Sequence, residues 1–248
     1  MKKKIRLDLF LFENKIVNSR NKAKELILNN SVIVNGKIID KASFFVDKND
    51  KIEIENNILF VSRAGIKLEH AIKYWKIDLK NKNILDIGSS TGGFIEVCLN
   101  NGANFIYGIE VGYGQLDKKL ENNPKIKNYE NLNFKDVQNN LFDKEIDYIT
   151  CDVSFISCKK IIEKIVELFK YKFYAVILIK PQFELSNNEI TKYKGFVNDN
   201  KMHEKIIESY KLFCNEKKIR VIDIIESPIK GSKSGNKEFI SYLEFNYE

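Results

Sequence analysis

The sequence predicts an α/β protein with two domains: a small α+β domain over residues 1–60 and a larger, doubly wound domain over residues 61–248. In the larger domain, short apolar runs alternate with helical patterns, as in a mostly parallel sheet covered by helices. The smaller domain shows two amphipathic helical patterns followed by a short hairpin. The change between these patterns sets the expected boundary.

Two helices and a hairpin are expected in the small domain. Residues 7–16 and 19–30 carry apolar side chains at helical spacing, so each range predicts one helix. The apolar stretches 31–39 and 50–54 follow and predict strands. Asn35-Gly36 lies inside the first stretch, and this pair favours the backbone of a two-residue hairpin turn. A unit of about 60 residues is marginally stable alone and gains stability from a neighbour.

Apolar stretches predict seven strands in the larger domain, and helical patterns separate the first six. Only about eleven residues join the last two strands, which is short for a parallel crossover. We therefore expect the last strand to run antiparallel. The expected strands are 84–87, 105–110, 126–129, 146–151, 173–179, 220–226 and 239–245, with helices that include 93–100, 157–169 and 201–216.

The segment ILDIGSSTGG, from Ile84 to Gly93, predicts a strand that ends in a glycine turn and leads into a helix. Gly88 lets the backbone approach a ligand closely, and the following helix N-terminus offers free N–H groups. The glycine spacing differs from the G-x-G-x-x-G pattern of dinucleotide sites. It favours a smaller adenosyl ligand, and S-adenosylmethionine is the first candidate. A plain packing turn is the alternative interpretation.

Charged side chains lie at the ends of five predicted strands, at the edge where open α/β sheets bind ligands. Asp86 lies at the end of the first strand and Glu110 ends the second, and their separation suits an acid that accepts hydrogen bonds from ribose hydroxyls. Asp152 and Lys180 follow the fourth and fifth strands. Because the last strand is reversed, Glu238 at its start lies on this edge too. We therefore expect Asp152, Lys180 and Glu238 to converge.

Lys180 follows the apolar run 173–179 and precedes Pro181, so its amine leaves the buried end of a strand. Burial and a second cation would favour the neutral, basic amine, whereas neighbouring carboxylates would favour the ammonium. A structural lysine paired with Asp152 is the alternative. The residues after Asp152, Val-Ser-Phe, lack the two prolines common in enzymes that methylate exocyclic amines. A hydroxyl oxygen is therefore the better target.

The basic residues are concentrated near the N-terminus. Residues 1–24 contain eight basic and two acidic side chains, which is +6 of the formal net charge of +7. This asymmetry indicates a polyanionic partner, although lysine is abundant throughout the chain. The four cysteines and two histidines show no metal-site spacing, so we expect no metal. No apolar run approaches the ~20 residues that span a bilayer. We expect a cytoplasmic monomer without stable membrane association.

Several segments, in order along the chain, resemble the TlyA family of ribosomal RNA 2′-O-methyltransferases, whose members are also called hemolysins. The resemblance covers essentially the whole chain. It implies a class I methyltransferase domain of the FtsJ type that uses S-adenosylmethionine, preceded by an RNA-binding domain of the kind named after small-subunit ribosomal protein four. The segments are RLDLFL, SRNKAKELI, VNGK, VSRAGIKLEHA, LDIGSSTGGF, VGYGQL, CDVSFIS, IKPQFE and GNKEF.

The resemblance also implies site residues and a substrate. A Lys-Asp-Lys-Glu tetrad falls on Lys67, Asp152, Lys180 and Glu238. The implied reaction is methylation of a ribose 2′-hydroxyl of ribosomal RNA, at cytidine, with the large-subunit RNA favoured because the chain resembles the shorter subgroup. The implied cofactor contacts are Asp86, Gly88, Ser89, Ser90, Thr91, Gly92, Gly93, Glu110 and Asn133, and the expected RNA contacts are Arg6, Arg20, Lys22, Lys24 and Arg63.

Three other functions compete with this hypothesis. A non-catalytic RNA-binding assembly factor would not need the glycine turn or the tetrad. A membrane-lytic protein would need a spanning segment or a strongly amphipathic interfacial helix, and the sequence offers neither. A methyltransferase acting on proteins or small molecules would not need the basic N-terminal domain.

Overall fold

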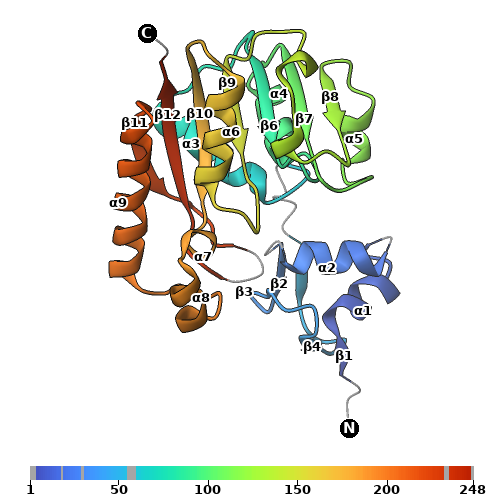
Figure 1. Cartoon of the computed structure of the whole chain (residues 1–248). Coiled ribbons are helices and arrows are strands. Elements are labelled where there is room, and N and C mark those ends of the chain that lie inside the picture. The colour runs from blue at the N-terminus through green and yellow to red at the C-terminus, as the bar shows by residue number, and fades with distance from the viewer. Residues whose placement is uncertain (1–3, 18, 29–30, 55–59, 232–234, 247–248) are drawn as a thin grey trace. The chain divides into compact units, whose positions relative to one another are not determined.

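The computed structural model describes residues 4–17, 19–28, 31–54, 60–231 and 235–246. The chain divides into two compact units, Met1–Arg63 and Ala64–Glu248. Figure 1 draws the first unit in blue and the second from cyan to red. Each unit is described separately below.

Helices α1 (Leu7–Glu13) and α2 (Arg20–Leu28) pack together in the first unit. Leu11 and Ile27 are fully buried in this core, in agreement with the helical spacing of their apolar residues. The first helix is shorter than expected because Lys15 adopts a left-handed backbone with φ 57°, which ends a helix.

The predicted hairpin of the first unit is confirmed. Asn35 and Gly36 have φ values of 51° and 77°, which are the left-handed values of a type I′ turn. The hairpin belongs to a three-stranded antiparallel sheet in the order β3-β2-β5. Strands β1 and β4 form a second, two-stranded antiparallel sheet. This sheet was not predicted, because strands of two residues are too short to show an alternation of apolar and polar residues. The strands are β1 (Ile5–Arg6), β2 (Val32–Val34), β3 (Lys37–Ile38), β4 (Phe45–Val46) and β5 (Ile52–Ile54).

The second unit is built on a seven-stranded sheet in the order β11-β12-β10-β9-β6-β7-β8 (Figure 1). Strands β10, β9, β6, β7 and β8 are parallel, whereas β12 is antiparallel to both β10 and β11. The predicted sheet with a reversed last strand is therefore confirmed. The strands are β6 (Asn83–Ile87), β7 (Phe105–Ile109), β8 (Ile126–Tyr129), β9 (Tyr148–Cys151), β10 (Phe173–Ile179), β11 (Arg220–Glu226) and β12 (Phe239–Phe245).

Helices cover both faces of this sheet. In Figure 1, α6 and α9 lie in front of or beside the sheet, and α3 and α4 lie behind it. On α6, Ile161, Ile165 and Leu168 recur at helical spacing and are buried in one core with the sheet. The helices are α3 (Ala64–Trp75), α4 (Gly93–Asn100), α5 (Lys118–Glu121), α6 (Cys158–Leu168), α7 (Pro181–Glu184), α8 (Asn187–Tyr193) and α9 (Asn200–Glu216), with 3₁₀ turns at Phe134–Asp136 and Asn139–Leu141.

The strand register fixes which residues meet at the carboxyl edge of the sheet. Ile87 pairs with Cys151 between the parallel strands β6 and β9, so Gly88 and Asp152 follow side by side. Ile179 pairs with Phe239 between β10 and the reversed β12, so Lys180 and Glu238 leave the ladder together. The reversal of β12 is therefore what brings Glu238 to this edge.

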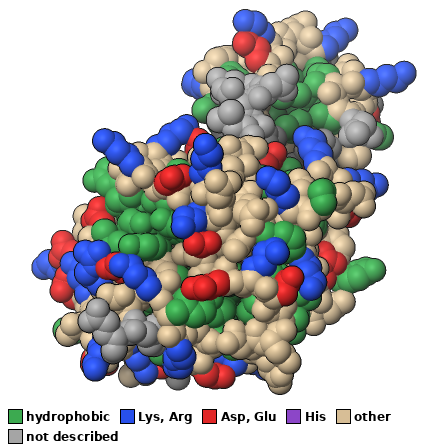
Figure 2. Space-filling model, turned by 90° about the horizontal axis from the view of Figure 1, so that it is seen from above, with side chains coloured by type: hydrophobic (Ala, Val, Ile, Leu, Met, Phe, Trp, Pro, Cys, Tyr) green, Lys and Arg blue, Asp and Glu red, His purple; other side chains and the backbone are tan. Residues whose placement is uncertain are grey.

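On the face of the molecule in Figure 2, Lys and Arg side chains are interspersed with Asp and Glu side chains, and hydrophobic side chains lie between them. Charges of the two signs therefore offset one another locally over this face.

Candidate active site

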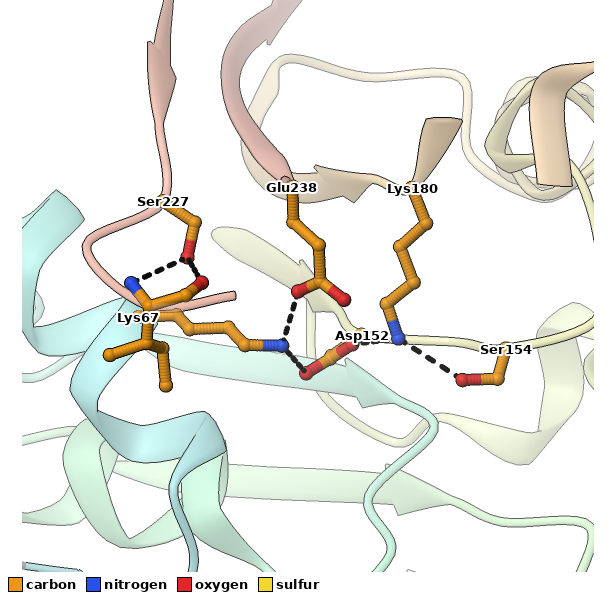
Figure 3. A network of polar contacts seen from close by, with 7 residues as sticks. Lys67, Asp152, Ser154, Lys180, Ser227 and Glu238 are labelled. Carbon is orange, nitrogen blue, oxygen red and sulfur yellow. Dashed lines mark hydrogen bonds and ion pairs between the residues drawn. The ribbon is translucent and has the colours of Figure 1, made fainter. Parts of the chain in front are cut away.

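Four charged side chains from four elements meet at the carboxyl edge of the second unit (Figure 3). Lys67 lies on α3, Asp152 follows β9, Lys180 follows β10 and Glu238 precedes β12. The Lys67 Nζ atom lies 3.2 Å from Asp152 Oδ2 and 2.6 Å from Glu238 Oε2. The Lys180 Nζ atom lies 2.5 Å from Asp152 Oδ1. We call these four residues the Lys-Asp-Lys-Glu cluster.

The cluster is buried and its charges offset one another. The side chains are at most 12% exposed, and two amines face two carboxylates. Burial acts to lower the pKa of Lys67, but the charges of Asp152 and Glu238 outweigh it and raise that pKa above its usual value. Burial acts to raise the pKa of Asp152, but the two amines outweigh it and lower that pKa. Lys67 and Asp152 are therefore held in their charged forms.

The two amines differ in their surroundings. Lys67 contacts two carboxylates, whereas Lys180 contacts the carboxylate of Asp152 and donates to the Ser154 hydroxyl at 3.1 Å. The ammonium form of Lys180 therefore has less anionic support than that of Lys67. Ser154 was not among the predicted site residues, although it lies two positions after Asp152 in the segment that the sequence analysis quoted.

The glycine turn packs against the cluster. Gly88 has φ 84°, and a Cβ there would lie 3.1 Å from Val153 Cγ1 and 3.2 Å from the Asp152 carbonyl oxygen. The Gly88 N–H donates to Ile109 O at 2.8 Å, which fixes the turn to the neighbouring strand. The packing interpretation therefore explains why glycine is needed at position 88. It also places the turn directly beside Asp152.

Asp86 provides a direct test of whether the turn fits an adenosyl cofactor with a cationic group. Its side chain is buried, and Oδ1 accepts a hydrogen bond of 2.7 Å from Thr150. Its Oδ2 atom is buried and has no hydrogen-bond partner among the described residues. Burial raises the pKa of Asp86 to about 7, with further contributions from the charges of Asp152 and Glu110. An unpaired carboxylate oxygen at this place fits a cationic donor such as the ammonium of S-adenosylmethionine.

Glu110, which directly follows β7, is buried and faces the same turn. One carboxylate oxygen accepts from the Ser90 N–H and the other from the Gly112 N–H, both at 2.8 Å. The Gln115 Nε2 atom also donates to the oxygen that accepts from Gly112, at 3.5 Å. The oxygen that accepts from Ser90 keeps a second lone pair, which suits a ribose hydroxyl. Ser89 donates its hydroxyl to Asn128, and exposed Asn133 caps a 3₁₀ turn through its side chain. The remaining predicted cofactor residues, Thr91, Gly92 and Gly93, lie on the turn and at the start of α4.

An exposed aromatic side chain lies beside the cluster. Phe155 follows Ser154, has a left-handed backbone with φ 65°, and is 84% exposed. The centroid of its ring lies 5.3 Å from the centroid of the Phe183 ring on α7. A bulky residue in this conformation is uncommon and indicates a local constraint. In the sequence this phenylalanine stands only as part of a motif, and its exposure was not predicted.

In the first unit, the structure brings together Arg6 and Arg20 around one acid. The buried Asp8 carboxylate accepts from Arg6 Nε at 2.9 Å and from Arg20 Nε at 3.0 Å. Burial acts to raise the pKa of Asp8, but the two arginines outweigh it and lower that pKa. Both guanidinium groups stay partly exposed. Of the other predicted RNA contacts, Lys24 and Arg63 are half-buried, and the side chain of Lys22 lies outside the described residues.

The seven-stranded sheet, its reversed last strand and the glycine turn at its edge form the architecture of a class I methyltransferase. Residues 60–245 match the model of the FtsJ-like methyltransferase family, and residues 5–52 match the S4 domain. The chain belongs to the FtsJ-like methyltransferase family and carries an S4 domain on its N-terminal side. The predicted fold class is confirmed, and S-adenosylmethionine is the cofactor.

Two named relatives and one solved structure resemble the chain over nearly its whole length. Hemolysin A of Brachyspira hyodysenteriae is 39% identical, over 96% of this chain and 99% of that protein. The 23S rRNA (cytidine-2′-O)-methyltransferase TlyA of Campylobacter jejuni is 35% identical, over 96% of this chain and 98% of that protein. The structure of a Streptococcus thermophilus protein described as a hemolysin has a TM-score of 0.76 and 31% identity, covering 99% of this chain and 90% of that chain.

Within the described ranges, none of the helices is long and apolar enough to cross a membrane.

The packing of Gly88 against Asp152 predicts a specific cost for alanine at this position. Gly114 is a matched control, because its φ is 63° but a Cβ there would have no atom within 4 Å. Gly114→Ala should lower the free energy of unfolding by about 1 kcal/mol through backbone strain alone. Gly88→Ala should lower the free energy of unfolding by at least about 1 kcal/mol more, because its Cβ is also crowded by neighbouring atoms. Urea unfolding measures both, and equal losses would contradict the packing described here.

Proposed function

We propose that the protein transfers a methyl group to a ribose 2′-hydroxyl of ribosomal RNA, at a cytidine, with the large-subunit RNA as the first candidate. The observation that carries this proposal is the buried Lys-Asp-Lys-Glu cluster beside the glycine turn. The name of the Campylobacter jejuni relative and the S4 domain support the choice of RNA. A protein that acts on ribosomal RNA works where ribosomes are assembled, so we place it in the cytoplasm.

The cofactor would be held by the turn and its two acids. The free Oδ2 of Asp86 would accept from the ammonium, and the Oε2 atom of Glu110 would accept from a ribose hydroxyl. The turn from Gly88 to Gly93 would lie against the rest of the S-adenosylmethionine molecule. When bound, S-adenosylmethionine supplies the methyl group, which its positively charged sulfur makes electrophilic.

The cluster would activate the 2′-hydroxyl. Lys180 has the weaker anionic support of the two amines, so it is the group that accepts the proton from the hydroxyl oxygen. Lys67 stays charged between its two carboxylates and stabilises negative charge on that oxygen. Asp152 holds both amines in place. General-base help of this kind contributes ~10²–10⁴-fold in rate.

RNA would be positioned by groups from both units. The guanidinium groups of Arg6 and Arg20, held around Asp8, offer N–H donors to phosphates, and such contacts position RNA without reading its sequence. Near the cluster, the exposed ring of Phe155 offers a stacking face for an unpaired base. The sequence from Asp152 to Phe155 lacks the prolines of amine methyltransferases, which favours a hydroxyl as the target.

The proposed function is tested with purified ribosomal subunits from cells that lack this protein. The full-length protein and labelled S-adenosylmethionine are added, and 2′-O-methylation is mapped across both ribosomal RNAs. We expect label at a cytidine ribose, first in the large-subunit RNA. Label in the small-subunit RNA alone would overturn the preference, and stable RNA binding without any methyl transfer would instead indicate a non-catalytic assembly factor.

Lys180→Ala should reduce methyl transfer by at least about 100-fold, because the general base is lost. Lys180→Arg should reduce it similarly, since arginine keeps the positive charge but does not give up its proton. Lys160→Ala, which changes an exposed lysine on α6, is the control and should leave turnover unchanged. Near-normal turnover of the arginine variant would contradict the assigned role.

The affinity for S-adenosylmethionine should depend on pH. The pKa of Asp86 is raised to about 7, so its carboxylate is charged above this pH and protonated below it. Calorimetry should therefore show affinity falling below pH 7, by up to about tenfold for each further pH unit. Asp86→Asn should bind weakly and lose this dependence, whereas Asp136→Asn, on an exposed acid, should behave as the unmodified protein. An unchanged pH profile in Asp86→Asn would exclude Asp86 as the titrating group.

A further inference from the structure

We propose that Asn236 is a positioning residue of the active site, whose side-chain amide fixes the approach to β12 and so holds Glu238 against Lys67. The inference rests on the function proposed above, because it assigns Glu238 and Lys67 to the reaction. It concerns a residue outside the Lys-Asp-Lys-Glu cluster, and it is drawn from the contacts of the segment that precedes β12.

Asn236 is fully buried and both ends of its amide are bonded to one backbone segment. Its Oδ1 accepts from the Val197 N–H at 2.8 Å, and its Nδ2 donates to the Gly195 carbonyl at 2.8 Å. A side-chain amide paired in this way with an N–H and a C=O two residues apart makes the hydrogen bonds that the backbone of a neighbouring strand would make. Asn236 therefore fastens the segment before β12 to the segment that joins α8 and α9.

The segment on the other side of this contact is itself anchored. The Val197 side chain is buried, and the Val197 carbonyl lies 3.0 Å from His203 Nε2 on α9. The ring of His203 packs edge-on against Phe239, the first residue of β12, with centroids 5.5 Å apart. Asn236 thus bonds to a point that α9 holds in place, and α9 contacts the sheet through β11.

Glu238 depends on contacts outside the strand ladder. The ladder of β12 begins at Phe239, so Glu238 lies one residue before its first pair. The Glu238 carbonyl accepts from the Ser227 N–H at 2.9 Å, and the Asn236 carbonyl accepts from the Gly231 N–H at 2.9 Å. The backbone is therefore fixed at Asn236 and again at Glu238 and Phe239. Figure 3 shows the Glu238 side chain extending from this point toward Lys67.

The placement of Glu238 matters because its contact with Lys67 is short and buried. Glu238 Oε2 lies 2.6 Å from Lys67 Nζ, and Glu238 is 3% exposed. A displacement of the segment would leave Lys67 with Asp152 as its remaining carboxylate in the cluster. Misplacement of about 1 Å at a reacting centre can cost about 100-fold in rate.

Asparagine suits this position for a chemical reason. The contact needs one acceptor for the Val197 N–H and one donor for the Gly195 carbonyl, and a side-chain amide supplies both. An alanine would leave the buried Val197 N–H and the Gly195 carbonyl without the amide. A serine hydroxyl supplies both functions at a shorter reach, so it would restore the contact in part.

The test compares Asn236→Ala and Asn236→Ser with Asn198→Ala, an exposed asparagine one residue after Val197. In the full-length protein we expect Asn236→Ala to lower kcat for ribosomal RNA by about 10- to 100-fold. The Kd for S-adenosylmethionine should stay within about twofold of its normal value, because Asp86 and the turn are untouched. Asn236→Ser should lose less, and Asn198→Ala should match the unmodified protein.

A second readout distinguishes positioning from loss of stability. NMR of isotope-labelled lysine side chains follows the titration of the Lys67 amine without RNA. Because Glu238 helps to raise the pKa of Lys67, that titration should move to lower pH in Asn236→Ala. The alkaline limb of the pH–rate profile should move in the same direction. If Asn236→Ala does not fold, kcat and the Lys67 titration are measured on Asn236→Ser instead.

An unmoved Lys67 titration would overturn the proposal, whether kcat stays normal or falls together with cofactor binding. Failure of the proposed function would look different. In that case the unmodified protein would transfer no methyl group to ribosomal RNA, while the Lys67 titration would still respond to Asn236→Ala.

Discussion

The site depends on one buried carboxylate that is shared by two amines. Asp152 contacts Lys67 through one oxygen and Lys180 through the other. Two ammonium groups at such close quarters repel each other, and burial strengthens this repulsion because the surroundings screen charge weakly. The shared carboxylate makes their proximity tolerable, and Glu238 supplies a second carboxylate beside Lys67. Without this carboxylate, no attraction would offset the repulsion between the two amines at Asp152.

The fold provides this arrangement through strand direction. Parallel strands β9 and β10 deliver Asp152 and Lys180 to the carboxyl edge of the sheet. A parallel β12 would place the residue before it at the opposite edge, far from both. Because β12 is inserted in reverse between β10 and β11, Glu238 arrives beside Lys180 instead. The reversed last strand is thus part of the chemistry as well as of the architecture. Gly88 completes the arrangement by letting the neighbouring turn pack on the Asp152 backbone.

Much of this geometry could be predicted from the sequence. The apolar runs predicted the strands, and the short link before the last strand predicted that this strand runs antiparallel. Together they placed Asp152, Lys180 and Glu238 at one edge. Lys67 was different, because α3 precedes the first strand of the sheet and its periodicity does not say which residue reaches the edge. Only the resemblance to a family pointed to it.

What sequence reasoning missed depends on contacts between segments far apart in the chain. Asp8 accepts from both Arg6 and Arg20, yet neither helical spacing nor charge counting shows that these residues share a partner. The role of Asn236 depends on Val197, 39 positions earlier. Phe155 is exposed and its backbone is left-handed, and no propensity predicts this conformation for phenylalanine. Such features follow from tertiary packing, and local patterns do not carry them.

The central claim is that Asp152 holds the two amines in a working arrangement, and Asp152→Asn tests it most directly. The change keeps the size of the side chain and removes its charge. Turnover on ribosomal RNA, measured beside the affinity for S-adenosylmethionine, should fall by at least about 100-fold while the cofactor still binds. Turnover close to that of the unmodified protein would contradict the account.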